Sequence, residues 1–254
     1  MGLVNISFKS DLHVHTLMSG HAFNTMNECI AKASELMLDY LGIADHGPSM
    51  EGAPHLGYFE VFSRIPKQIN DIKMLYGCEA NIINVDGEID ITDELSEHLN
   101  YVMAGLHERT PYNEMSIIKN TSAIINAMKR GKINIITHLY RKNFPVDIHD
   151  AVYCAKETNI ILEINKSVLL SALINKDHRL IANLNRMIEL IIETGTRCIV
   201  GSDAHYTSEI GISKQEWDIM SANYNLSNIE TSNNDIKLLE NLWNSKKQKE
   251  MFYA

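Results

Sequence analysis

Seven of the eleven histidines in this chain, together with one glutamate and one aspartate, lie where predicted strands end and loops begin. The nine residues are His13, His15, His21, His46, Glu79, His107, His138, Asp203 and His205, and they extend over most of the 254-residue chain. Side chains so far apart in the sequence can meet only where many strand ends converge, as they do at the carboxyl rim of a parallel barrel. The distribution therefore favours a closed or strongly curved sheet over an open, doubly wound one.

The apolar pattern indicates the α/β fold class. Short apolar runs alternate with helical patterns along the chain, which is typical of repeated β-α units. We predict strands near residues 9–15, 40–45, 74–80, 100–106, 133–138, 160–165 and 197–202. We predict a three-turn helix after the capping box Thr25-x-x-Glu28, further helices near 58–71, 114–130, 147–157, 179–194 and 235–246, and a loop at 223–234. A chain of this length can bury one large core, and we expect residues 1–254 to form a single domain.

Two short motifs place pairs of metal-binding side chains on one face of a strand. In Asp11-Leu-His13-Val-His15, alternate residues project to the same side. In Gly201-Ser-Asp203-Ala-His205, a carboxylate and an imidazole share a face in the same way. Neutral imidazole suits zinc, iron or manganese, whereas an all-oxygen set would favour magnesium or calcium. The distribution of these donors predicts a multinuclear site for transition-metal ions.

The composition argues against several classes of protein. A formal net charge of -9, with no basic run before Lys246-Lys247, argues against a nucleic-acid-binding surface. No stretch approaches the ~18 uninterrupted apolar residues of a membrane span, and no signal-peptide pattern opens the chain. Four cysteines without a C-x-x-C pair suit reduced thiols. We therefore expect a soluble, cytoplasmic protein with neither a nucleic acid nor a membrane as partner; the pattern does not define an oligomeric state.

The motifs of the chain resemble those of the PHP (polymerase and histidinol phosphatase) family, and in particular its small stand-alone phosphatases of the YcdX type. The matching stretches are Asp11-Leu-His13-Val-His15-Thr16, His21, Asp45-His46-Gly47-Pro48, Gly77-Cys-Glu79-Ala-Asn81, Asn84-Val-Asp86-Gly87-Glu88-Ile-Asp90, Gly105-Leu-His107-Glu108, Thr137-His138, Glu163-Ile-Asn165 and Gly201-Ser-Asp203-Ala-His205. They cover almost the whole chain and keep the family's order of donors. The resemblance implies a distorted seven-stranded, TIM-like β/α barrel, which agrees with the strand count above.

The resemblance also implies three divalent cations, most often zinc, with manganese or iron in some members. It assigns the first cation to His13, His15, Glu79 and Asp203, the second to His107, His138 and the bridging Glu79, and the third to His21, His46 and His205. A hydroxide shared by the first two cations would then be the nucleophile, because paired cations lower the pKa of a bound water.

Several other residues are candidates for the substrate pocket. Glu79, Arg109 and Arg141 form the candidate catalytic set, with the two arginines as phosphate contacts; a solvated loop charge is the alternative for each arginine, and the favoured interpretation for Lys142. Further candidates to reach the pocket or its mouth are Met50, His55, Tyr58 and Lys166. Asp11 and Asp45 either orient imidazoles or make ordinary hydrogen bonds at strand ends.

The loop after His138 departs from the pattern of the family. A turn resembling His-Pro-Gly is often found there, whereas this chain has Leu139-Tyr140-Arg141-Lys142-Asn143-Phe144-Pro145. Because that loop should border the pocket, no relative's substrate can be transferred directly. We expect a metal-dependent phosphatase acting on a phosphomonoester of a small metabolite. The alternatives are a histidinol-phosphate phosphatase, a phosphodiesterase or nuclease, and a metal-binding module without enzymatic activity.

Overall fold

The computed structural model of the chain describes residues 8–226 and 229–244. In these ranges, seven parallel strands form one sheet in the order β1-β2-β4-β5-β6-β7-β8. They are β1 (Ser10–Val14), β2 (Tyr40–Ile43), β4 (Ile72–Asn81), β5 (Tyr101–Gly105), β6 (Ile135–Ile136), β7 (Ile161–Asn165) and β8 (Cys198–Gly201). A two-residue strand, β3 (Gln68–Ile69), pairs antiparallel with β4.

The sheet curves until its first and last strands meet. Beyond β8, Ala204 forms a parallel bridge with Val14 of β1. The backbone amide of His15 donates to the carbonyl of Ala204 at 3.0 Å, and the amide of Ala204 donates to the carbonyl of His13 at 3.3 Å. The prediction of a distorted seven-stranded β/α barrel is confirmed.

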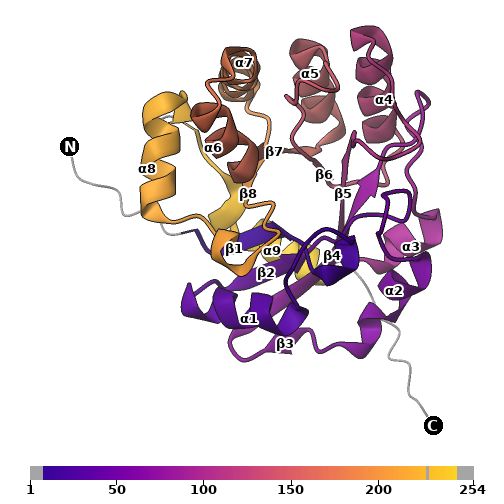
Figure 1. The fold of residues 1–254 in the computed structure, drawn as a ribbon, viewed down its shortest axis with the longest axis vertical. Helices are drawn as coiled ribbons and strands as arrows, with labels where there is room; N and C mark the ends of the chain where they lie inside the picture. Colours follow the sequence, from indigo (N-terminus) through magenta and orange to yellow (C-terminus); the bar gives the residue numbers. More distant parts are fainter. Residues whose placement is uncertain (1–7, 227–228, 245–254) are drawn as a thin grey trace.

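Helices surround this ring of strands (Figure 1). They are α1 (Met26–Glu35), α2 (Leu56–Glu60), α3 (Asp93–His98), α4 (Ile117–Lys129), α5 (Ile148–Thr158), α6 (Lys166–Ile174), α7 (His178–Thr194), α8 (Lys214–Asn223) and α9 (Ile236–Asn244). Figure 1 shows the ring face-on, with α4, α5 and α7 side by side outside its upper edge and α1 below it. Their buried faces form the main core between helices and sheet.

A second apolar cluster fills the inside of the ring and continues into α9. Leu75 and Tyr101 of the strands pack in one cluster with Leu239 and Leu242 of α9. The side-chain amide of Asn100, just before β5, donates to the carbonyls of Leu242 and Trp243 at 3.1 and 3.2 Å. Because these contacts involve the beginnings of the strands, α9 closes the amino-terminal end of the barrel.

The expected elements differ from the observed ones in a few places. The helix predicted at 58–71 is wrong only in its second half: α2 continues into a 3-10 turn (Val61–Arg64), after which the chain turns into β3. Pro66, which lacks an amide hydrogen, follows this turn and cannot extend a helical ladder. Helices α3, α6 and α8 were not predicted. The last helix was expected at 235–246, and residues 245 and 246, like 227 and 228 of the predicted loop and the Lys246-Lys247 pair, lie outside the described residues.

Two expectations concern the chemical environment of the chain. All four cysteines are buried and carry free thiols. Among the helices of the described residues, none has both the length and the apolar character needed to cross a bilayer.

Candidate metal centre

The structure brings all nine candidate donors together at the carboxyl-terminal end of the barrel. His13 lies in β1 and Glu79 in β4, and the other donors follow β1, β2, β5, β6 and β8. Seven of them, His21, His46, Glu79, His107, His138, Asp203 and His205, line a cavity of about 310 Å³. His13 and His15 are fully buried beside them and contact Glu79 and Asp203.

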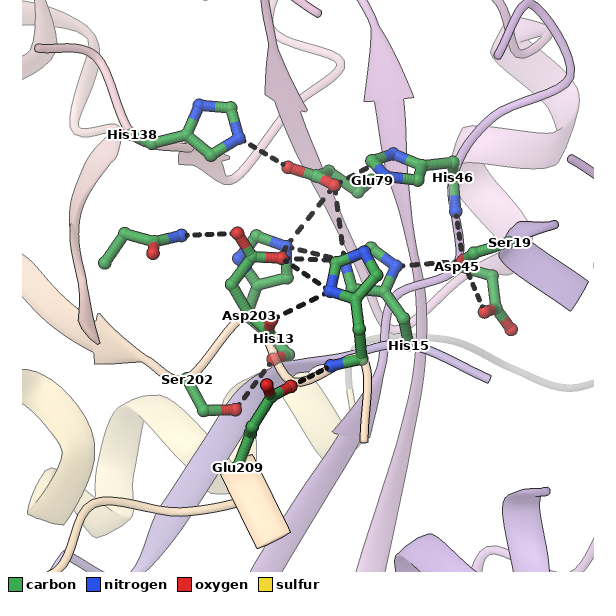
Figure 2. Close-up of polar contacts among 12 residues, drawn as sticks. His13, His15, Ser19, Asp45, His46, Glu79, His138, Ser202, Asp203 and Glu209 are labelled. Carbon is green, nitrogen blue, oxygen red and sulfur yellow. Dashed lines mark hydrogen bonds and ion pairs between the residues drawn. The ribbon is translucent and has the colours of Figure 1, made fainter. Parts of the chain in front are cut away.

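Glu79 is the centre of this arrangement, because its two carboxylate oxygens face different groups of histidines. Oε1 lies 3.1 Å from Nε2 of His107 and 3.1 Å from Nε2 of His138. Oε2 lies 3.3 Å from Nε2 of His13 and 3.5 Å from Nε2 of His15. Figure 2 shows the carboxylate between His138 on one side and His13 and His15 on the other.

The spacing of the donor atoms fits transition-metal ligation. Nε2 of His13 lies 3.1 Å from Nε2 of His15, and Oδ1 of Asp203 lies 3.1 Å from the same His15 atom. On the other side of Glu79, the Nε2 atoms of His107 and His138 are 3.2 Å apart. Four ligands at about 2.0–2.1 Å from a tetrahedral zinc ion lie roughly 3.3 Å from one another. The residues therefore fit two cations, one on each side of the Glu79 carboxylate.

Unsatisfied polar atoms support the same interpretation. Within the described residues, Oε2 of Glu79 and Nδ1 of His46 are buried and make no hydrogen bond of regular geometry. These two atoms lie 3.0 Å apart. Buried polar atoms rarely lack hydrogen bonds in folded proteins, and a site for a bound ion is one of the accepted reasons for an exception. This carboxylate oxygen, with imidazole nitrogens 3.0–3.5 Å away, lies where the metal-binding hypothesis requires a ligand.

The outer donors are less enclosed. His21 is exposed and its ring stacks on those of His46 and His205, with centroids 5.0 and 4.9 Å away. One nitrogen each from His15, His46 and His205 lie within 4.8 Å of one another. The rings of His46 and His205 are 6.3 Å apart. A third cation can be held here, but its donors are more loosely spaced than those around Glu79.

The electrostatics favour neutral imidazoles next to ionised carboxylates. Burial, with the charge of Arg141, lowers the pKa of His138 to about 3, and burial holds the pKa of His15 well below its ordinary value. Burial alone would raise the pKa of Glu79, but His13, His107 and His46 keep it well below its ordinary range. Metal ligands need these protonation states.

His13 behaves differently from the other buried histidines. Burial would lower its pKa, but the carboxylates of Glu163, Glu79 and Asp203 raise it well above the ordinary value. Three negative groups around one imidazole favour positive charge at this point, whether a proton or a cation provides it.

Asp45 supports the centre through an intermediate hydroxyl. Its Oδ1 accepts from the hydroxyl of Ser19 at 2.7 Å, and the oxygen of that hydroxyl lies 2.9 Å from Nδ1 of His15. The hydroxyls of Thr16 and Tyr58 donate to Oδ2 at 2.8 and 2.7 Å. Asp45 thus orients an imidazole indirectly, one of the two roles considered for it.

Asp11 has the second role considered, which is ordinary hydrogen bonding at a strand end. Its carboxylate accepts from the backbone amides of His13, Ser202 and Gly211 at 3.2, 3.2 and 2.8 Å. These contacts fix the backbone on both sides of the seam between β1 and β8.

The cationic candidates separate into two groups. Arg109 and Arg141 line the cavity, as predicted for phosphate contacts, and Met50 lines it as well. The expectation that Lys166 reaches the pocket is wrong: its ammonium is buried and donates to the carbonyls of Glu209 and Gly211 at 2.6 and 2.7 Å. Lys142 forms an ion pair with Asp177 at 3.0 Å on the surface, in agreement with its predicted role as a loop charge.

Other candidates have structural roles. His55 does not line the cavity; it caps α2 by accepting from the amide of Gly57 at 3.1 Å. Sequence reasoning did not assign roles to Asp90, Glu163 and Asn165, although all three lie in motifs quoted above. Asp90 accepts from the amide of Ser49 at 2.8 Å and from the side chain of Asn81, and so fixes the loop after His46. The partners of Asp90 lie up to 41 positions away, which no local pattern reveals.

Comparison with known proteins identifies the family of the chain. The model of the PHP domain matches residues 11–235, so the chain belongs to the PHP domain family. A probable phosphatase of Clostridium acetobutylicum is 37% identical over 201 residues, which are 79% of this chain and 80% of that protein. A probable phosphatase of Clostridium botulinum is 35% identical over 242 residues, covering 95% and 97% of the two chains.

Solved structures share the fold. The histidinol phosphate phosphatase of Lactococcus lactis, in complex with zinc, L-histidinol and phosphate, has a TM-score of 0.62 at 12% identity and covers 88% of this chain and 95% of its own. A putative histidinol phosphatase of Listeria monocytogenes has a TM-score of 0.57 at 17% identity, covering 82% and 100%. At these identities the likeness establishes the architecture.

Proposed function

We propose that this chain is a metal-dependent phosphatase that hydrolyses the phosphomonoester of a small metabolite. The observation that carries the proposal is the Glu79 carboxylate, whose two oxygens face separate groups of histidines at 3.1–3.5 Å. The full-length relatives named probable phosphatases support the same activity. We further propose that the matched residues 11–235 and α9 form a single domain.

We propose that these donors hold three divalent cations, with zinc favoured and manganese or iron as alternatives. The first would be held by His13, His15, Glu79 and Asp203, the second by Glu79, His107 and His138, and the third by His21, His46 and His205. When bound, such cations generate a nucleophile from water near neutral pH and neutralise the charge of the phosphoryl group.

The chain's own residues orient the substrate. Arg109 is exposed and Arg141 half-buried at the rim of the cavity, where guanidinium groups can bind phosphate oxygens in bidentate fashion. Met50, which is buried, supplies an apolar wall for the organic part of the substrate. A cavity of about 310 Å³ is at the small end of the range for ligand pockets, which favours a small metabolite over a polymer.

Two other activities remain as candidates. Histidinol phosphate is one, because the Lactococcus lactis protein of the same fold was solved with L-histidinol and phosphate. The loop from Leu139 to Pro145, which carries Arg141, differs from the turn expected from the family resemblance, so that substrate cannot be transferred directly to this chain. A phosphodiesterase or nuclease is the other, and the net charge of -9 counts against it because nucleic acids bind basic surfaces.

The test combines metal analysis with paired chromogenic substrates. The protein is purified with zinc or manganese supplied, its metal content is measured by elemental analysis, and p-nitrophenyl phosphate is compared with bis(p-nitrophenyl) phosphate. We expect about three ions per chain, monoester hydrolysis well above diester hydrolysis, and loss of both metal and activity after chelation. His178→Ala, at the exposed start of α7, is the matched control and should behave as the parent. A chain that binds no ions, or prefers the diester, contradicts the proposal.

The substrate itself requires a panel of phosphorylated metabolites that includes histidinol phosphate. A clear preference for one chemical class defines the metabolite. A preference for histidinol phosphate replaces the general proposal with the narrower one.

A further inference from the structure

Strand β7 differs from the other parallel strands at the functional end of the barrel. Within the described residues, it is the one parallel strand that neither contains nor leads into a candidate donor. It ends instead in Glu163-Ile-Asn165, and the side chains of Glu163 and Asn165 are fully buried. A buried carboxylate is costly unless it is paired and hydrogen-bonded. Its partners therefore indicate its role.

Glu163 contacts donors on both sides of Glu79. Its Oε1 lies 2.5 Å from Nδ1 of His13, a ligand proposed for the first cation. Its Oε2 accepts from the backbone amide of His138, a ligand proposed for the second cation, at 3.1 Å. His138 has φ = 27°, a left-handed conformation unfavourable for a residue with a side chain, so this hydrogen bond fixes a strained backbone.

Asn165 extends the same contact to a third donor. Its side-chain nitrogen lies 3.1 Å from Oε2 of Glu163 and 3.1 Å from Oδ2 of Asp203. Its side-chain oxygen accepts from the amide of Val168 at 3.0 Å and so caps α6. The capping contact determines which end of the amide faces the two carboxylates.

The contact with His13 also selects a tautomer. If Nδ1 carries the hydrogen donated to Glu163, the lone pair on Nε2 is directed toward Glu79 and Asp203, which lie 3.3 and 3.5 Å away. Space for this carboxylate depends on Gly201, because a Cβ atom there would lie 2.2 Å from Oε1 of Glu163 and 2.9 Å from Cβ of His13.

We propose that Glu163 is a positioning residue that couples the first and second cation positions, because one carboxylate holds a ligand of each, with Asn165 as its link to Asp203. The inference rests on the proposed metal centre. It predicts that a change at Glu163 weakens two ions together, although Glu163 is not a ligand of either.

Glu163→Gln tests the coupling with little change in size. A carboxamide can accept from only one of the two donors, His13 or His138, and presents its own N–H to the other. Equilibrium dialysis against stepped concentrations of free Co²⁺, with metal counted by elemental analysis, measures the result. We expect affinity for two of the three ions to fall roughly 10–100-fold, the range found when partners of ligating residues are changed. Where the parent holds three ions, the variant should hold one, with matching loss of the Co²⁺ absorption bands.

Asp11→Asn is the matched control. Asp11 is also a fully buried carboxylate, but its hydrogen-bond partners are the backbone amides of His13, Ser202 and Gly211, with no imidazole among them. This variant should have a lower melting temperature and still bind three ions.

Asn165→Asp gives a second test if Glu163→Gln does not fold. The substitution keeps the oxygen that caps α6 and places a third carboxylate beside Glu163 and Asp203. It should also weaken binding at the first two cation positions.

The outcomes separate this inference from the proposed function. If the parent binds three ions and Glu163→Gln loses one or none, the coupling role is overturned and the metal centre stands. If Asp11→Asn loses the same two ions, the effect belongs to general destabilisation and the coupling role is also overturned. A parent chain that binds no ions overturns the proposed function and the coupling together.

Discussion

The two ends of the barrel differ in the side chains that fill them: one end is polar and the other is apolar. At the carboxyl-terminal end, side-chain atoms of histidines and carboxylates lie 2.5–3.5 Å from one another, and His138 and Asp203 have positive φ angles of 27° and 55°. At the amino-terminal end, α9 covers an apolar cluster in which Leu75 and Leu239 are fully buried. In barrels of this kind the first end carries the chemistry and the second contributes stability. Substitutions at the two ends should therefore affect turnover and stability separately.

The largest effect on turnover is expected for Glu79→Gln. Replacing one oxygen by an amide weakens both proposed inner cations at once, so we expect kcat/KM to fall by about 10³-fold or more. The metal-free variant should melt no lower than the metal-free parent. Monoester hydrolysis with saturating metal measures kcat/KM, and a thermal melt of the metal-free proteins measures their stability. Activity equal to that of the parent would show that this carboxylate does not bridge two ions.

His138→Ala should have a smaller effect, because only one of the proposed inner positions loses a ligand. We expect turnover to fall about 10²-fold, with the fold retained and part of the activity restored by excess metal. A metal titration of the initial rate measures this. Unchanged turnover at limiting metal would remove His138 from the centre.

Arg141→Met should have a smaller effect still. The guanidinium is half-buried at the rim, so water screens its contact with phosphate and we expect a loss of about 10-fold, mainly through KM. Metal content should stay at the value of the parent. A change in kcat with KM unchanged would contradict a binding role.

At the opposite end, Leu239→Ala should leave the turnover of each folded molecule unchanged. Truncation of this fully buried side chain should lower the free energy of unfolding by about 2–5 kcal/mol. Denaturant unfolding of the metal-free chain gives the free energy of unfolding, and the activity per folded molecule gives the turnover. Ile236→Ala, on the exposed side of α9, is the control. Equal loss of turnover and stability would mean that the two ends are not independent.

The sequence predicted the parallel strands well because they follow a local pattern. Each parallel strand is a short apolar run, and each candidate donor lies at or just beyond the end of such a run. Helix α6 was missed because its sequence, KSVLLSALI, shows no clear polar face. Helix α8 was missed although Ser213 and Glu216 form a capping box, a local signal that announces a helix.

The supporting network was beyond the reach of local patterns. Glu163 and His13 are 150 positions apart, and Asp11 and Gly211 are 200 positions apart. Motif resemblance marked Glu163 and Asn165 without assigning them a role. Only the closure of the sheet shows which side chains they contact.

The seam at which Val14 meets Ala204 also bears on when the proposed cation positions can form. During synthesis, His13 and His15 leave the ribosome long before Asp203 and His205 are translated. A nascent chain that has not yet completed β8 lacks the last ligands of the proposed first and third positions. The proposed first and third positions therefore depend on closure of the ring, whereas the ligands of the proposed second position, Glu79, His107 and His138, all precede β8 in the chain.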